Sequence, residues 1–364
     1  MAERASLRVG ILLSDGLAAQ GGIGRVVSYL TRHLAAHRPD IATTVLRARY
    51  STRSGLKHLT VPAALARFAA ACASIDVAHI NIAPRGSTWR KMLFARVARL
   101  SGVPVLLHLH GSGYDEYYAT LSPTRQSAVR RFFRDADAVV VLSPFWRRFM
   151  EGTLGVPAER VTEIPNGVPE ADPPVLQRPP AAEPHVLFLG VVGERKGIDV
   201  FLEALATLSR QNVPFHATVG GNGEVEAARA RAAELGLADR VAFIGWVDEA
   251  RVDAELRRAD LFVLPSRAEN QPVAILEAMA RGVPVVATRV GGIAEQLADG
   301  AAGLLVEAGH ADALADAIGG LLRDAPGRTA LGAAGRDRFA KHYALSACAD
   351  RFAALYHRLA GTAA

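Results

Sequence analysis

The feature that most constrains the fold is a regular alternation between short apolar runs and longer segments with helical periodicity. This alternation favours parallel sheets flanked by helices, because each strand reaches its parallel neighbour through a crossover helix. In the first half, strands are expected near 7–13, 41–48, 76–82, 103–109 and 137–142. The helices between them are expected near 23–36, 62–73, 89–100 and 124–134.

A proline-rich segment, "PEADPPVLQRPPAAEP" at 169–184, interrupts the alternation and cannot continue a helix or a central strand. Strand-like runs then resume at 185–190, 215–220, 240–245, 260–265 and 283–288. The predicted fold class is therefore α/β, with two doubly wound Rossmann-like domains that face a central cleft at the carboxyl ends of their strands. The predicted parts are an N-terminal domain at 1–172, a linker at 173–184, a C-terminal domain at 185–345 and a final helix at 346–364.

The final helix should pack back towards the N-terminal domain. Its apolar residues recur at three- and four-residue spacings, as one buried face requires; they are Phe352, Leu355, Tyr356 and Leu359.

Composition excludes several classes of protein. The chain has 364 residues, of which 50% are hydrophobic and 21% charged, so it is not a disordered chain. No apolar run reaches the roughly 20 residues that span a bilayer, and no cleavable leader is indicated. Two cysteines, Cys72 and Cys348, are too few for a disulfide framework and wrongly spaced for zinc. A cytoplasmic location is expected.

Positive charge is concentrated in the first half of the chain. Residues 1–172 hold 22 Lys and Arg against 13 Asp and Glu, whereas residues 173–364 hold 20 against 23. This surface favours an anionic partner such as nucleic acid, phospholipid or a phosphorylated substrate. No nucleic-acid-binding module is recognisable, so nucleic acid is not expected as a partner.

Two glycine-rich turns follow strands. The first, with Gly21, Gly22 and Gly24, leads into a helix whose exposed amides favour an anion, although a simple strand-to-helix turn explains it equally well. Its spacing is not G-x-G-x-x-G, and the next strand ends in the basic run "VLRARY", which disfavours a nicotinamide site. The second turn places Arg195 and Lys196 before a helix, which suits a diphosphate or simply two solvated cations.

Two carboxylates bracket the segment "ENQPVAILE". Pro272 should be the first residue of a helix, and Gly282 should end it. Glu269 then lies on the preceding loop and Glu277 in the first two helical turns. Each acid alone could be solvated surface, but carboxylates also accept from paired sugar hydroxyls. With Arg195 and Lys196 they suggest a ligand that has phosphates in its middle and polyols at both ends.

These motifs together resemble the family-4 retaining glycosyltransferases of the GT-B fold. Glu269 and Glu277 match the family's E-x7-E signature, and Gly291 and Gly292 follow the next strand. "FLGVVGERKG", "IPNGV" with Asn166, "FIGWV" and the first glycine loop with Gly21 and Gly22 match in order over nearly the whole chain.

The resemblance implies that a nucleotide diphosphate sugar binds here. Glu277 would hold the ribose and Glu269 the donor hexose, while Arg195 and Lys196 would neutralise the diphosphate and act as catalytic cations. The transferred sugar would lie against the backbone of residues 270–273, and Val247 would lie near the base. The implied donor-binding residues are Gly21, Gly22, Asn166, Val247, Asn270, Gln271, Pro272, Val273 and Glu277. His110, which ends a strand, matches a family histidine near the hexose or is a locally satisfied strand-end histidine.

Two positions depart from the family pattern. Val191 stands where an Arg often follows the glycine, so Arg195 would take over part of the phosphate contact. "ENQP" replaces an acid-glycine-apolar-proline run, so the side chains of Asn270 and Gln271 could add hydrogen bonds to the donor.

No metal and no bound cofactor are expected. Asp135 and Asp137 imitate the D-x-D of metal-dependent transferases but fall in an ordinary helix-to-strand connection. In the resembled family, retaining transfer is explained without an enzyme nucleophile, through cations that stabilise the leaving group.

The segment "STWRKMLFARVARL" at 87–100 has an apolar face with Trp89, Met92, Leu93, Val97 and Leu100, surrounded by Arg90, Lys91, Arg96 and Arg99. Such a helix suits either a peripheral contact with an anionic membrane or a sheet-covering helix with a solvated basic back.

The leading hypothesis is a hexosyltransferase that moves a hexose from a UDP- or GDP-sugar to a hydroxyl of a glycan or lipid-linked acceptor. The alternatives are a GT-B-like sugar-nucleotide epimerase and a non-catalytic sugar-nucleotide-binding subunit.

Overall fold

The computed structural model describes residues 6–17, 21–49, 60–171 and 183–362. Most of the predicted linker, 173–182, lies outside these residues. The chain divides into two compact units: an N-terminal unit of Met1–Gly167 with Leu345–Ala364, and a C-terminal unit of Val168–Ala344.

The N-terminal unit is built on one parallel sheet. Its strands are β1 (Leu7–Leu13), β2 (Ile41–Arg47), β3 (Val77–Ile82), β4 (Val105–Leu109), β5 (Ala138–Val141) and β6 (Val161–Glu163). Their order in the sheet is β2-β1-β3-β4-β5-β6, and all neighbours pair in parallel. The chain therefore moves outward from β1 to β2 and then returns to β3 on the other side of β1.

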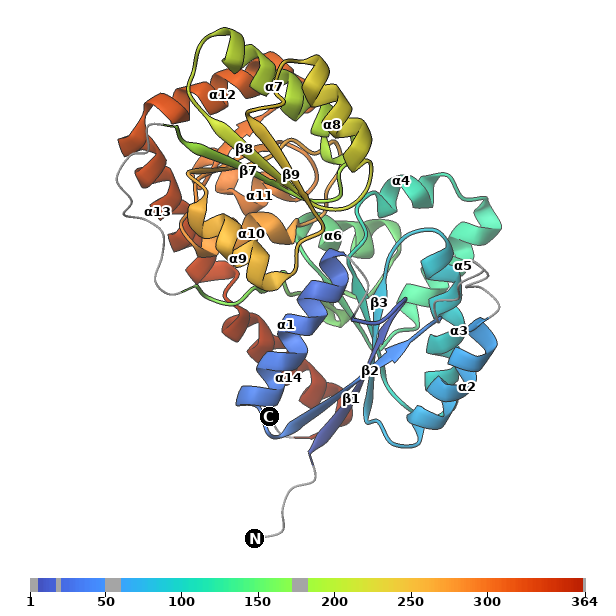
Figure 1. Cartoon of the computed structure of the whole chain (residues 1–364). Helices are drawn as coiled ribbons and strands as arrows, with labels where there is room; N and C mark the ends of the chain where they lie inside the picture. Colours follow the sequence, from blue (N-terminus) through green and yellow to red (C-terminus); the bar gives the residue numbers. More distant parts are fainter. Residues whose placement is uncertain (1–5, 18–20, 50–59, 172–182, 363–364) are drawn as a thin grey trace. The chain divides into compact units, whose positions relative to one another are not determined.

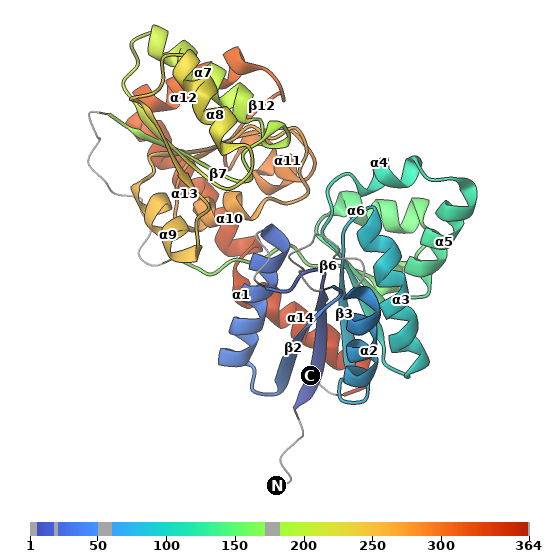
Figure 2. The same cartoon turned by 45° about the vertical axis from the view of Figure 1, so that its right-hand side comes forward.

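Helices cover both faces of this sheet, and Figures 1 and 2 show α1 and α14 on one face and α2 and α3 on the other. The longer helices are α1 (Gly22–His37), α2 (Val61–Cys72), α3 (Gly86–Leu100), α5 (Pro123–Arg134) and α14 (Leu345–Ala360). The shorter ones are α4 (Tyr114–Ala119), α6 (Pro144–Arg148), the π-helix η2 (Phe149–Thr153) and the 3-10 helix η3 (Ala158–Arg160).

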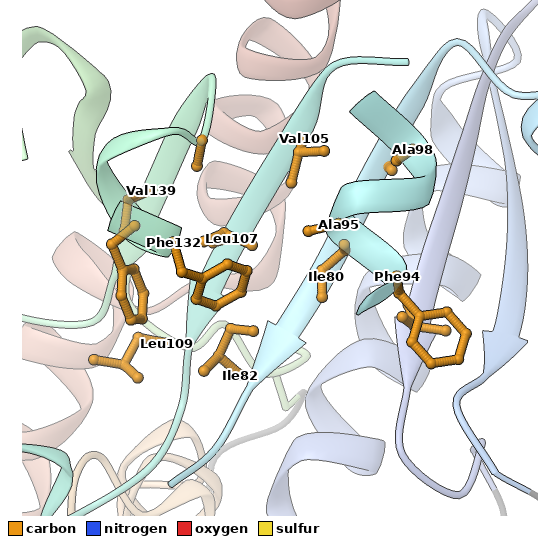
Figure 3. Packing of buried hydrophobic residues seen from close by; sticks show 14 of the residues in the cluster. Ile80, Ile82, Phe94, Ala95, Ala98, Val105, Leu107, Leu109, Phe132 and Val139 are labelled. Carbon is orange, nitrogen blue, oxygen red and sulfur yellow. The ribbon is translucent and has the colours of Figure 1, made fainter. Parts of the chain in front are cut away.

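Each face of the sheet has its own apolar core. Figure 3 shows the core beneath α3 and α5, where Phe94 and Phe132 pack with Ile80, Leu107 and Val139 of the strands. On the opposite face, Phe352, Leu355 and Tyr356 of α14 are buried with strand residues of β1, β3, β4 and β5, and Leu359 packs against the same cluster. The helix that ends the chain is thus an integral layer of the N-terminal unit.

The C-terminal unit repeats this architecture. Its strands are β7 (His185–Leu189), β8 (His216–Gly220), β9 (Val241–Gly245), β10 (Leu261–Leu264), β11 (Val285–Thr288) and β12 (Leu304–Val306), in the parallel order β12-β11-β10-β7-β8-β9. Its helices are α7 (Ile198–Arg210), α8 (Val225–Glu234), α9 (Glu249–Arg258), α10 (Val273–Ala280), α11 (Ile293–Gln296), α12 (Ala311–Arg323) and α13 (Ala325–His342), with the 3-10 helices η4 (Glu194–Lys196) and η5 (Ala298–Gly300).

The structure confirms the predicted α/β class with two doubly wound domains. The short outer strands β6 and β12 were not predicted, because three residues at a sheet edge leave too weak an apolar pattern to recognise. In both units the order in which successive strands are added reverses at the sheet centre, between β1 and β3 in one and between β7 and β10 in the other. Open α/β sheets bind ligands outside the carboxyl ends of their strands at such switch points.

The predicted faces of the helix at 87–100 were right in part, since Trp89, Met92 and Val97 pack against the core. The buried face of α3 carries Lys91, Phe94, Ala95 and Ala98, whereas Leu93 and Leu100 are 49% and 78% exposed. Lys91 therefore does not belong to a surface ring of cations. Packing against β3 and β4 decides which face of the helix is buried, and a lysine there was misread because lysine is rarely buried.

Candidate functional site

The loop after β7 brings two cations to the switch point of the C-terminal sheet. From Gly190 the chain forms the 3-10 turn η4, which carries Arg195 and Lys196, and then enters α7 through Gly197. Gly197 has φ +70°, and a Cβ there would lie 2.0 Å from the Pro265 carbonyl oxygen. Glycine is required because the loop packs directly on the backbone that follows β10.

Lys196 and Glu269 form an ion pair between the loops that follow β7 and β10. The side chains are 13% and 7% exposed, so the pair is shielded from water. Glu269 Oε1 also accepts from Ser266 Oγ at 2.8 Å, and Ser266 is fully buried. Arg195 is 54% exposed and places Nη1 4.0 Å from Glu269 Oε2. The structure thus brings Arg195, Lys196 and Glu269 into one cluster.

Arg267 braces the same two loops. Its guanidinium donates to both carboxylate oxygens of Asp199 at 2.9 and 2.6 Å and to the Glu194 carbonyl oxygen at 2.6 Å. The Arg267 amide donates to the Arg195 carbonyl at 2.9 Å, and Arg195 Nη1 donates to the Ala268 carbonyl at 3.1 Å. A forked, bidentate Arg–carboxylate contact fixes direction as well as distance, so this brace orients the Arg195-Lys196 turn.

Glu277 lies in α10, as predicted, and is 2% exposed. The prediction that Pro272 is the first helical residue was wrong by one position: α10 begins at Val273, and Pro272 precedes it with ψ 122°. The helix ends at Ala280, and Gly282 follows with φ +70°. The ring of Pro272 still restricts φ at the residue that precedes the helix.

The segment before α10 is buried and held by backbone contacts. Asn270, Gln271 and Val273 are 5%, 9% and 8% exposed. The Asn270 carbonyl accepts from the Gly292 amide at 2.9 Å, and the Pro272 carbonyl accepts from Gln296 Nε2 at 3.1 Å. A Cβ on Gly291 would lie 1.8 Å from the Glu269 carbonyl oxygen, and one on Gly292 would lie 2.3 Å from the Asn270 carbonyl oxygen. Close packing on this backbone therefore explains the glycine pair.

Val247, the residue expected near the base, is 7% exposed in the turn between β9 and α9, and the neighbouring Trp246 is 52% exposed. The remaining predicted residues belong to the N-terminal unit. Gly21 caps α1 in an extended conformation, and Gly22 is the first residue of that helix. Asn166 is buried just after β6.

His110 follows β4 and belongs to a buried polar chain. Its Nε2 lies 2.7 Å from Asn81 Oδ1, and Asn81 Nδ2 donates to the Leu12 carbonyl at 3.3 Å. Since the Asn81 amide nitrogen is committed to a carbonyl, its oxygen must accept, and the proton of His110 lies on Nε2. His79 continues the polar layer, with Nε2 3.1 Å from His108 Nδ1 and Nδ1 2.7 Å from the Tyr356 hydroxyl.

Burial keeps these histidines neutral. It lowers the pKa of His110 to about 3, with a smaller effect from the charge of Lys91. Burial likewise lowers the pKa of His79 to about 3, and that of His108 well below its usual value. At neutral pH, His110 is therefore a hydrogen-bonding group and not a cation.

Asp135 and Asp137 have the structural role that the sequence indicated. They connect α5 to β5, and Asp137 Oδ2 accepts from the Val105 amide at 2.8 Å while its own amide donates to the Val105 carbonyl at 3.0 Å. In the part of the chain that the structure describes, no three His, Cys, Asp or Glu side chains are grouped as metal ligands.

Sequence reasoning missed Ser266, Arg267 and Asp199 in the C-terminal unit and Asn81 in the N-terminal unit. Asn81 could have been noticed, because it and His79 interrupt an otherwise apolar buried strand. Arg267 and Asp199 are 68 positions apart and carry no local signal of their pairing.

Comparisons with known proteins agree with this architecture. The family described as glycosyl transferases group 1 matches residues 177–338, and the glycosyl transferase 4-like domain matches residues 12–167.

A GDP-mannose-dependent alpha-(1-6)-phosphatidylinositol monomannoside mannosyltransferase of Mycolicibacterium smegmatis is 33% identical over 69% of this chain and 67% of its own length. Alpha-D-kanosaminyltransferase of Streptomyces kanamyceticus is 29% identical over 72% of each chain. The structure of a sucrose-phosphate synthase from Thermosynechococcus elongatus matches with a TM-score of 0.77 and 26% identity, over 97% of this chain and 99% of that one. With two matching domains, these relatives and the paired parallel sheets, the chain belongs to the family-4 glycosyltransferases of the GT-B fold.

Proposed function

We propose that this glycosyltransferase is a retaining hexosyltransferase that moves a hexose from a UDP- or GDP-sugar to a hydroxyl of a glycan or glycolipid precursor. The observation that carries the proposal is the shielded contact of Lys196 with Glu269 at the switch point of the C-terminal sheet. It joins a cation suited to a diphosphate with a carboxylate suited to sugar hydroxyls. The name of the mycobacterial relative, which includes GDP-mannose and a phosphatidylinositol mannoside, supports this donor and acceptor class.

In the proposed reaction, the bond between the sugar's anomeric carbon and the β-phosphate oxygen breaks, and a bond to the acceptor oxygen forms on the same face. The acceptor's proton passes to the departing phosphate. Lys196 and Arg195 stabilise the charge that develops on the leaving diphosphate, which is the largest contribution a protein makes to such a transfer.

The remaining residues bind and orient the donor. Glu269 accepts from hexose hydroxyls and Glu277 from ribose hydroxyls. The backbone and side chains of residues 270–273 hold the transferred sugar, and Val247 lies against the base. In the N-terminal unit, Gly21, Gly22 and Asn166 contribute to donor binding, and His110 accepts at Nδ1 from a hexose hydroxyl, since its Nε2 donates to Asn81.

A donor panel tests the proposal. The protein is incubated with UDP-, GDP- and ADP-sugars, with and without candidate acceptors, and nucleotide release is followed together with the anomeric configuration of the product. We expect release with one base and an α-linked product from an α-linked donor. Epimerised donor without nucleotide release would identify an epimerase. Nucleotide binding without either reaction would identify a non-catalytic subunit.

Transfer should not depend on a metal ion. The positive charge that the leaving diphosphate needs is supplied by Arg195 and Lys196, whose turn is held by Arg267. Activity should therefore persist unchanged in excess EDTA. Loss of activity on chelation, with recovery on addition of Mg²⁺ or Mn²⁺, would contradict this prediction.

Peripheral contact with an anionic membrane is the proposed route to a lipid-linked acceptor. Across the described ranges, the structure contains no helix of the length and apolarity that crossing a bilayer requires. On α3, Leu93, Arg96 and Leu100 are exposed at helical spacing, so they form a mixed apolar and basic strip. Basic residues contribute roughly 1 kcal/mol each near an anionic surface, and the attraction fades with salt.

We accordingly expect weak co-sedimentation with anionic vesicles at low ionic strength and none with neutral vesicles. Combined substitution Arg96→Gln and Leu100→Gln should reduce it, because both side chains are exposed and carry no core packing. Arg210→Gln, an exposed change in the C-terminal unit, is the matched control. If the wild type and the double variant bound anionic vesicles equally, the exposed strip of α3 would be ordinary solvated surface and not a membrane contact.

A further inference from the structure

A buried lysine lies at the switch point of the N-terminal sheet. Lys91 reaches from α3 to the carboxyl ends of β1 and β3, where its Nζ donates to the Asn81 carbonyl at 2.8 Å and to the Leu12 carbonyl at 3.3 Å. Its side chain is completely buried. Lys196 also lies at the switch point of its sheet, but it follows the first strand, β7, and has a carboxylate partner, whereas Lys91 lies in the helix after β3 and donates to carbonyl oxygens.

Two arginines add to the charge at this position. Arg49, just beyond β2, makes a bidentate contact with Asp15, with both distances 2.7 Å. Arg90, next to Lys91 on α3, has a buried Nε that finds no hydrogen-bond partner among residues 6–17, 21–49, 60–171 and 183–362. The charges of Arg90, Arg49 and Asp15 all act on Lys91. Among the described residues, Lys91, Arg90 and Arg49 thus share the carboxylate of Asp15.

This excess of positive charge is costly in the absence of an anion, because desolvated cations require compensation. Burial, followed by the charge of Arg90, lowers the pKa of Lys91 to about 7. Burial and the charge of Arg49 likewise lower the pKa of Arg90. Arg49 and Arg90 are only partly buried, so they can reach a ligand, whereas Lys91 acts on it through its charge.

We propose that Arg49, Arg90 and Lys91 form a binding subsite for a phosphate group of the acceptor, at the carboxyl edge of β1 and β3. The proposal rests on the glycosyltransferase function proposed above, since it names the acceptor class of that reaction. The chemistry is a phosphate monoester or diester, and its source is either a soluble sugar or polyol phosphate or the headgroup of a phospholipid. Asn81 links the subsite to His110. Its carbonyl accepts from Lys91, and its Oδ1 lies 2.7 Å from Nε2 of His110.

The first experiment measures anion binding by calorimetry with sulfate, which does not titrate near neutral pH. Measurements are made with saturating UDP or GDP, so that the Arg195-Lys196 turn is occupied. We expect binding to weaken about tenfold or more in Arg90→Gln and in Arg49→Gln, the loss of one charge-assisted hydrogen bond. Arg96→Gln, an exposed change on the same helix, should leave it unchanged.

Three results would overturn the subsite: no sulfate binding by the wild type, equal binding by wild type and Arg90→Gln, or loss in Lys196→Gln but not in Arg90→Gln. Nucleotide affinity is measured in the same samples. If Arg90→Gln loses sulfate but keeps UDP or GDP, the subsite stands apart from the donor site. If the wild type binds sulfate but no nucleotide, the donor proposal fails and the anion site remains.

A second experiment uses the protonation of Lys91. A bound anion favours the protonated amine, so sulfate binding should take up a proton and weaken as the pH rises above about 7. The charged or titratable groups acting on Lys91 or affected by it are Arg49, Arg90, Asp15, His79 and His110. The two histidines have pKa values of about 3 and do not titrate in this range.

Proton uptake is obtained by titration in two buffers with different ionisation enthalpies. We expect uptake in the wild type and none in Lys91→Met, and uptake unchanged in Lys91→Met would contradict the assignment. If Lys91→Met does not fold, the arginine variants decide the result. Glycerol 3-phosphate against monomeric dihexanoyl phosphatidic acid then separates the sources: preference for the former indicates a soluble acceptor, and preference for the latter a lipid one.

Discussion

Replacement of Lys196 by Gln is expected to lower kcat for sugar transfer by about 10²–10³-fold, the loss typical of one group that stabilises developing negative charge. Lys196 is 13% exposed and is held by Glu269 and by the Arg267 brace, so its charge acts in a shielded site. Arg195→Gln should cost less, because Arg195 is 54% exposed and its interactions are weakened by water.

Single-turnover kinetics with saturating donor separate this effect on the chemical step from weaker binding. Arg210→Gln serves as a control for a lost surface cation. A Lys196→Gln protein that kept wild-type kcat would remove Lys196 from the catalytic residues. Folding of the variant is checked by its thermal melting temperature, since Glu269 loses its nearer cationic partner and keeps only the longer contact with Arg195 among the described cations.

Substitutions of the two carboxylates of the E-x7-E segment are expected to have different effects on nucleotide binding and on transfer. Glu277→Ala should weaken binding of free UDP or GDP by about tenfold to a hundredfold, because hydrogen bonds from the ribose hydroxyls to a buried carboxylate are lost. Glu269→Ala should leave nucleotide affinity nearly unchanged and lower kcat, because Glu269 faces the hexose and also orients Lys196.

Calorimetry with the nucleotide and with the intact donor measures both effects. Glu277→Gln and Glu269→Gln keep the shape of the side chains and test whether charge is required. Equal losses of nucleotide affinity in Glu269→Ala and Glu277→Ala would contradict the division of roles. Ser266→Ala is expected to lower kcat slightly, since Ser266 Oγ donates to Glu269 at 2.8 Å.

Much of the fold could be predicted because its signals are local. A strand such as β10, with four buried residues in succession, is an uninterrupted apolar run, and proline or glycine near the ends of α10 marks its limits. The eight-residue spacing from Glu269 to Glu277 likewise places one acid on a loop and the other on a helix without knowledge of any distant contact.

Much of the candidate site could not be predicted because its contacts are distant in the chain. Lys196 and Glu269 are 73 positions apart, and Arg267 meets Asp199 across 68. They approach each other only because β7 and β10 are neighbours in the sheet, which no local pattern specifies.

The sequence by itself determined the alternating elements, the loops that carry the cations and acids, and the family to which the chain belongs. Only the tertiary structure decided which side chains share a site. Lys91 shows the reason: its neighbours in sequence make it part of a basic helix, yet packing of α3 on β3 and β4 buries it against carbonyl oxygens of β1 and β3. Burial depends on the assembled sheet. In a desolvated position the pKa of the same ammonium group is lowered, and its charged form is stabilised by a nearby anion.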